Sequence, residues 1–160
     1  MRYPGMVDRS ILSGGIFRGN AAIKLFVRSA KVLNYFMSFP RMYSLFSYLL
    51  MPKNRNQVAR RVYQMQARRL TQKEYMKWVG LYAEFFALLR RFYDEQLRFP
   101  ALVVMGGDDY VFLAAAKSFV ARQPNAQLAE IPETGHICNI ESADSFNQLA
   151  YSFLRHSNAQ

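Results

Sequence analysis

The sequence predicts an α/β fold, in which a short parallel sheet of about three strands is joined by crossover helices. Residues 101–105, ALVVM, form a continuous β-branched and apolar run that ends at two glycines, as is typical of a strand buried on both faces. Strand and helix patterns alternate after Pro100, whereas residues 18–98 show helical periodicity. The chain therefore divides into a first core strand and turn (1–17), a helical segment (18–98) and a carboxyl-terminal α/β segment (99–160).

The first half of the chain is predicted to contain one strand and four helices. Residues 7–17 form a short apolar strand that runs into a glycine turn. The first helix has apolar residues three and four apart and is expected to close at Pro40, and the second is expected to stop at Pro52. A third helix is expected to have one apolar face and arginine pairs on the other face; the apolar residues are Val58, Val62, Met65 and Leu70.

The fourth helix is expected to begin at Thr71, because Glu74 stands three residues later in a capping-box arrangement. It runs to about Leu97. Beyond the strand at 101–105, the sequence predicts a helix at 111–123, a strand at 126–132 and a final amphipathic helix at 143–156.

Composition limits the class of protein. With 51% hydrophobic and 15% aromatic residues, 160 residues are enough to bury a core. A single cysteine, Cys138, excludes an intrachain disulfide and favours a reducing compartment. The first residues lack the order of a signal peptide, and no long apolar stretch free of charges occurs. We therefore expect a soluble, cytoplasmic protein.

The net charge of +10 is concentrated in the helical segment, where 16 Lys and Arg stand against four Asp and Glu. Arginine pairs at 60/61, 68/69 and 90/91 are interleaved with aromatic residues, as on surfaces that bind nucleic acids or anionic membranes. No nucleic-acid-binding motif accompanies them, so we expect no specific nucleic-acid partner. A solvated helix face is favoured over membrane contact.

Titratable side chains follow two neighbouring strands, at the points where the strands end. Asp109 lies in MGGDDY after residues 101–105, and His136 lies in ETGHIC after residues 127–131. Because the carboxyl ends of parallel strands share one edge of a sheet, the two loops are expected to be neighbours. A carboxylate beside an imidazole fixes its tautomer and stabilises its charged form, which is the orienting half of a nucleophilic triad.

Other polar residues nearby have simpler interpretations. Asp108 is the alternative acid, but a turn former that caps the following helix is the favoured role. Cys138 is interpreted as a small packed side chain and His156 as a solvated residue near the terminus. Asn139 and Glu141 are interpreted as loop and helix-start residues.

At these residues the chain resembles the carboxyl-terminal half of the α/β-hydrolase family. That part of the fold carries the triad acid in G-x-x-D after a strand and the triad base in G-H before the last helix. Gly106–Asp109 and Gly135–His136 match in order, spacing and context. The resemblance implies a partial α/β-hydrolase fold, with Asp109 and His136 as catalytic residues and 18–98 as an inserted helical cap.

The family's nucleophile lies in G-x-S-x-G, and these 160 residues contain no such motif. Ser13, in LSGGI, lacks the preceding glycine, and the resemblance places it on the strand after the nucleophile. We therefore expect a hydrolase of carboxylic esters, thioesters or lactones that is inactive without a nucleophile-bearing amino-terminal half. The alternative is a non-catalytic remnant or interaction module whose basic helices bind anionic partners or a membrane.

The expected ligand is a small acyl-type substrate. Five residues of the helical segment are expected to line its pocket: Phe36, Met37, Phe39, Met42 and Phe46. No cofactor and no metal site are expected. An uncovered apolar edge on the strand at 8–14 predicts that the chain self-associates or binds a chain that supplies the amino-terminal half.

Overall fold

The computed structural model describes residues 4–34 and 36–156, without the side chains of Pro4, Ala22, Phe26, Lys31 and His156. The solvated role expected for His156 therefore lies outside the described residues. The chain forms two compact units. We call Met1–Phe17 with Asp94–Gln160 the sheet unit, and Arg18–Tyr93 the helical unit.

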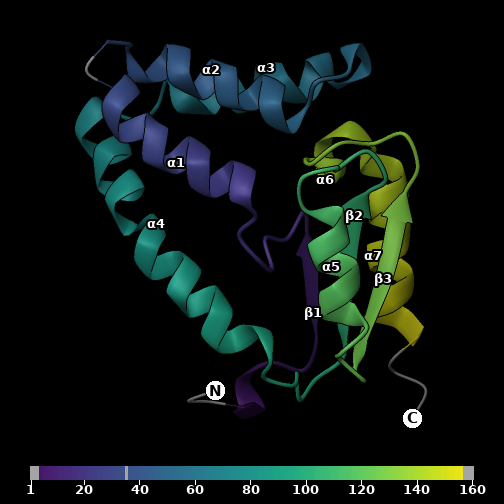
Figure 1. The fold of residues 1–160 in the computed structure, drawn as a ribbon. Coiled ribbons are helices and arrows are strands. Elements are labelled where there is room, and N and C mark those ends of the chain that lie inside the picture. The colour runs from purple at the N-terminus through teal and green to yellow at the C-terminus, as the bar shows by residue number, and fades with distance from the viewer. Residues whose placement is uncertain (1–3, 35, 157–160) are drawn as a thin grey trace. The chain divides into compact units, whose positions relative to one another are not determined.

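The sheet unit is built on three parallel strands, β1 (Ser10–Ser13), β2 (Ala101–Gly106) and β3 (Ala126–Ile131), in the order β1-β2-β3 (Figure 1). All residues of β2 are buried, because it pairs with β1 on one side and β3 on the other. This explains its unbroken apolar sequence, which suits a strand without a solvent face. The predicted short parallel sheet is confirmed.

Helices cover both faces of this sheet (Figure 1). Leu102 and Val104 of β2 pack in a core cluster with Phe146 and Phe153 of α7 (Ala143–His156). Alternation along a strand directs Val103 to the opposite face, where α5 (Leu113–Val120) packs on β2 and β3. The short helix α6 (Cys138–Glu141) precedes α7 and was not predicted.

The helical unit contains α1 (Ala21–Leu33), α2 (Phe39–Leu50), α3 (Gln57–Ala67) and α4 (Gln72–Tyr93). Single 3-10 turns occupy Asn54–Asn56 here and Pro4–Met6 in the sheet unit. Helix α1 packs on α4, and α2 packs on α3. Ala30, Met42 and Val79, from three different helices, form the core cluster of this unit.

Two helix ends correct the sequence interpretation. The prediction that Pro40 closes the first helix is wrong, because α1 ends at Leu33 and Pro40 lies in the first turn of α2. Proline fits there because the first backbone N–H groups of a helix have no intrahelical acceptor. Helix α4 ends at Tyr93 rather than near Leu97.

The apolar face predicted for α3 is wrong in part: Val62 within α3 and Leu70 beyond its end are half-buried, but the other two members are exposed. Val58 and Met65 are 65% and 55% exposed, whereas Ala59 and Arg60 are buried. Arg60 donates hydrogen bonds to the carbonyl oxygens of Met51 and Lys53 and lies over the Tyr48 ring. A buried guanidinium is tolerated here because carbonyl groups in the segment after α2 accept hydrogen bonds from it.

The predicted capping box at the start of α4 is confirmed. The Thr71 backbone N–H donates to Glu74 Oε2 at 2.8 Å, and the Glu74 N–H donates to Thr71 Oγ1 at 3.2 Å. These bonds lower the pKa of Glu74 below its ordinary value. Each residue satisfies a backbone donor that the helix itself leaves unpaired.

No helix among the described residues is long and apolar enough to cross a membrane.

Strand β1 gives the sheet an open edge, since no other described strand pairs with its outer side. The N–H groups of Ser10 and Gly14 bond to the β2 side, so the alternating N–H groups of Ile11 and Ser13 point away from β2. We predict that the 18.6 kDa chain self-associates through this edge as its concentration rises. Sedimentation velocity checks this, and a single 18.6 kDa species at all concentrations would contradict it.

Candidate active site

The acid side of the site is a tight turn at the carboxyl end of β2. The Asp109 N–H donates to the Gly106 carbonyl at 3.1 Å, which folds the chain back directly after the strand. Asp109 Oδ1 then accepts the Phe112 N–H at 3.0 Å and so caps the entry to α5. One carboxylate oxygen is therefore fixed by backbone, and the other is directed elsewhere.

That second oxygen meets the imidazole. His136 Nδ1 lies 2.8 Å from Asp109 Oδ2, and the Asp109 side chain is fully buried while that of His136 is 15% exposed. The Phe112 ring packs against the imidazole with centroids 4.9 Å apart. A carboxylate acceptor selects the tautomer with the proton on Nδ1, which leaves Nε2 as the basic nitrogen.

Nε2 of His136 has no hydrogen-bond partner among the described residues. The alternative acid, Asp108, is not the one on the imidazole. Its backbone N–H donates to the Thr134 carbonyl at 2.8 Å and so ties the acid turn to the loop that carries His136. The structure thus brings Asp109 and His136 together from 27 positions apart in sequence.

Two glycines allow this loop, residues 132–137, to lie directly on the strand ends. A Cβ atom at Gly106 would overlap the carbonyl oxygens of Gly135 and Thr134. A Cβ atom at Gly14 would lie 2.5 Å from the His136 carbonyl oxygen, and Gly14 also has a left-handed φ of 55°. Any other residue at these positions would push the backbone around His136 away from the sheet.

Side chains that follow the base hold the same loop from the other side. Glu141 Oε2 accepts the Gly135 N–H at 3.0 Å, and Thr134 Oγ1 lies 2.9 Å from Ser142 Oγ. Glu141 was interpreted as a helix-start residue, and its role as an acceptor for the loop was missed. Its position at the end of a one-turn helix five residues after His136 is the signal that was available.

Cys138 is buried beneath this loop. Its thiol donates to the Val104 carbonyl at 3.6 Å and lies 3.4 Å from Ser13 Oγ. Burial raises the pKa of this thiol, and the contact with Ser13 lowers it by less. Cys138 therefore joins β1, β2 and α6 as a packed protonated side chain, in agreement with its predicted role.

The five residues expected to line a substrate pocket are separated by the structure. Met42 and Phe46 line a cavity in the helical unit. Met37 packs against the core cluster, Phe39 stacks on Tyr75 at 5.2 Å, and Phe36 is 84% exposed. Phe36 lies after the end of α1, where the helical periodicity used for the prediction no longer holds.

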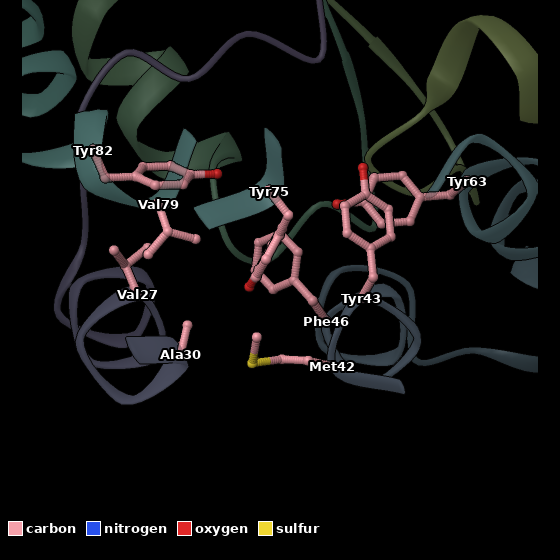
Figure 2. A pocket seen from close by; sticks show the side chains of 9 residues that line it. All are labelled: Val27, Ala30, Met42, Tyr43, Phe46, Tyr63, Tyr75, Val79 and Tyr82. Carbon is pink, nitrogen blue, oxygen red and sulfur yellow. The ribbon is translucent and has the colours of Figure 1, made fainter. Parts of the chain in front are cut away.

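The remaining lining of this cavity is rich in tyrosine (Figure 2). It consists of Val27, Ala30, Tyr43, Tyr63, Tyr75, Val79 and Tyr82. The sequence analysis grouped Tyr63, Tyr75 and Tyr82 with the arginine pairs instead. The available signal was the spacing of Tyr75, Val79 and Tyr82, which places them on one face of a helix.

No group of three or more His, Cys, Asp or Glu side chains that could hold a metal ion occurs within residues 4–34 and 36–156.

Curated proteins match only a part of the chain, and no family model matches it. A segment of 56 residues is 41% identical to the dihydrolipoyllysine-residue acetyltransferase component of the acetoin cleaving system of Pseudomonas putida. A segment of 60 residues is 40% identical to the 2-hydroxy-6-oxo-6-phenylhexa-2,4-dienoate hydrolase of Burkholderia cepacia. These segments are 35% and 37% of this chain and 14% and 21% of those proteins.

Solved structures match almost the whole chain. The meta-cleavage product hydrolase of Pseudomonas fluorescens superposes with a TM-score of 0.69 at 18% identity, over 98% of this chain and 58% of that one. A thermophilic esterase gives 0.66 at 18% identity, over 97% and 59%. The chain has the carboxyl-terminal half of an α/β-hydrolase fold.

A third neighbour, the enol-lactonase of Burkholderia xenovorans, gives a TM-score of 0.66 at 19% identity, over 92% of this chain and 56% of that one. The chain thus spans less than two thirds of these α/β-hydrolase structures. At such identities the likeness establishes the fold.

We predict that Gly106→Ala lowers the free energy of unfolding by about 3 kcal/mol, because rigid carbonyl groups rather than a flexible side chain would have to move. Gly80→Ala is the matched control. Gly80 lies within α4 with open space around it, so its replacement should raise stability by about 0.5–1 kcal/mol. Urea unfolding followed by circular dichroism measures both, and equal effects would contradict the close packing at Gly106.

Cys138 gives a second prediction. Since burial raises its pKa, less thiolate is present in the folded chain at neutral pH than in the unfolded chain. We expect alkylation by iodoacetamide near neutral pH to be much slower in buffer than in urea at the same pH. Equal rates in both conditions would show that the thiol is accessible and unshifted.

Proposed function

We propose that this chain supplies the acid and base of a serine-type hydrolase that acts on carboxylic esters, thioesters or lactones. The observation that supports this most directly is the 2.8 Å contact between Asp109 Oδ2 and His136 Nδ1 at the carboxyl edge of a parallel sheet. Such an edge is where α/β folds gather their chemistry. The hydrolases among the chain's structural relatives are consistent with this class of reaction.

In the proposed reaction His136 Nε2 removes the proton of a serine hydroxyl as the serine oxygen attacks the substrate carbonyl carbon. Asp109 stabilises the resulting imidazolium and keeps its orientation. The imidazolium then returns the proton to the departing alcohol or thiol, which leaves an acyl-serine. Water attacks the acyl carbon in the same way, and the acid and serine are released.

The serine is not assigned to this chain. Ser13 Oγ contacts the thiol of Cys138, and Ser13 ends β1 instead of standing on a strand-to-helix turn. We propose that a segment with the G-x-S-x-G turn supplies the nucleophile, either from another chain or from a longer form of this protein. The 160 residues alone are then inactive.

We further propose that the helical unit is the cap segment of this fold and that the protein works in the cytoplasm. The helical unit holds 15 Lys and Arg against two Asp and Glu, so its field attracts anionic molecules. This same charge supports the second candidate function, an interaction module without catalysis that binds anionic partners.

The decisive experiment combines the 160-residue chain with an amino-terminal half that carries G-x-S-x-G, taken from one of the structurally similar esterases. A fluorescent phosphonate that labels active serines should label this complex and neither piece alone. Asp109→Asn should reduce ester hydrolysis on the order of 10⁴-fold because the imidazole loses its tautomer control. His136→Ala should have an effect at least as large.

Asp108→Asn is the matched control, because it removes a neighbouring carboxylate that does not contact the imidazole. It should keep most of the activity. If a folded complex is not labelled, or if Asp109→Asn and Asp108→Asn hydrolyse equally well, the interaction module becomes the better explanation.

A further inference from the structure

The cavity of the helical unit combines an apolar lining with a set of hydroxyl groups (Figure 2). Its volume is about 80 Å³, and it is partly open to solvent. Met42, Phe46 and Val79 supply apolar surface, and four tyrosines surround it. We call it the tyrosine cavity. An apolar pocket with a few convergent polar groups is the usual form of a small-molecule site.

The four hydroxyls fall into two kinds. Tyr43 and Tyr63 stack with ring centroids 4.4 Å apart, and burial followed by the nearby Tyr43 raises the pKa of Tyr63. The hydroxyls of Tyr75 and Tyr82 have no hydrogen-bond partner within the described part of the chain, although both side chains are half-buried. Figure 2 shows the Tyr75 hydroxyl directed into the space between Ala30 and Met42.

These two hydroxyls remain donors over the whole physiological range. Burial, followed by the nearby Tyr82 and Tyr43, raises the pKa of Tyr75 to about 12. Burial, followed by the nearby Tyr43, also raises the pKa of Tyr82 above its ordinary value. A phenol that stays protonated offers its O–H to an acceptor and does not repel one by charge.

The lining also selects the charge of a ligand. None of its nine residues is basic or acidic, so an anion that entered would lose its hydration without gaining a cationic partner. A neutral carbonyl oxygen needs only a hydrogen-bond donor. The basic residues of the helical unit therefore do not by themselves make this cavity a site for anions.

Size and shape limit the rest of the ligand. A cavity of about 150 Å³ can enclose a benzene ring. The smaller tyrosine cavity is partly open, so it can hold most of one ring or a short unsaturated chain whose far end stays in solvent. Aromatic walls favour such a planar group through offset or edge contacts.

We propose that the tyrosine cavity binds a neutral small molecule that joins an aromatic or short unsaturated group to a carbonyl oxygen, which accepts a hydrogen bond from Tyr75 or Tyr82. Ketones, esters and lactones of this kind belong to the class. The binding goes beyond the proposed hydrolysis and does not depend on it, because every group involved lies in the helical unit.

The test uses the full 160-residue chain and two probes of similar shape, acetophenone with a carbonyl acceptor and ethylbenzene without one. Titration followed by NMR gives both affinities. Tyr75→Phe combined with Tyr82→Phe should weaken acetophenone about fivefold, the value of one neutral hydrogen bond, without weakening ethylbenzene. Tyr151→Phe, the same change at an exposed residue of the sheet unit, should alter neither affinity.

Val27→Phe fills the cavity from a partly exposed position and should abolish the binding of both probes while circular dichroism remains unchanged. The two probes are also compared on the unaltered chain, so this part of the test does not depend on whether a variant folds. Failure of acetophenone to saturate this chain would overturn the proposal. So would an acetophenone affinity that the double tyrosine variant leaves unchanged. Because no catalysis is measured, neither result bears on the role of Asp109 and His136.

Discussion

Strand β2 is the constraint on which the arrangement of the site depends. It is buried on both faces and paired on both edges, so neither its direction nor its register can change without loss of the sheet unit's core. Its carboxyl end therefore presents Gly106 at a fixed place. The turn that follows aims Asp109, and the close approach of Thr134 and Gly135 to Gly106 fixes the loop of His136 relative to it. A packed core thus determines the distance between an acid and a base.

The two units divide the chemistry of the chain. The sheet unit holds the buried carboxylate and the imidazole, and the helical unit holds most of the positive charge together with an uncharged cavity. Arg60 shows how the helical unit holds one of these charges in a buried position, because the backbone carbonyls of Met51 and Lys53 accept hydrogen bonds from its guanidinium. The 76 residues from Arg18 to Tyr93 therefore combine a high positive charge with an uncharged cavity. The charge of the unit does not determine which ligand the cavity accepts.

Sequence patterns predicted the features that depend on hydrophobic periodicity and on turn and capping residues. The β-branched run at β2, the capping box of Thr71 and Glu74, and the loops at two strand ends all depend on local rules, and each is present. Features set by tertiary packing were not predictable in the same way. Burial of Arg60 depends on carbonyls seven and nine positions away, and the tyrosine cavity is lined by side chains from all four helices α1 to α4. Periodicity alone therefore assigned the exposed Val58 and Met65 to the apolar face of α3, and three of the five expected pocket residues do not line the cavity.

The glycine at position 106 has a consequence for how a complete site would be assembled. Since the strand end and the neighbouring loop are in direct backbone contact, the backbone that carries His136 is held against the sheet, and Asp109 holds the imidazole through its Nδ1. A polypeptide that docks beside β1 would meet a half-site whose geometry is already set, so little conformational entropy would be lost at that step. The rate of assembly would then be governed by encounter and strand pairing, with no slow rearrangement to follow.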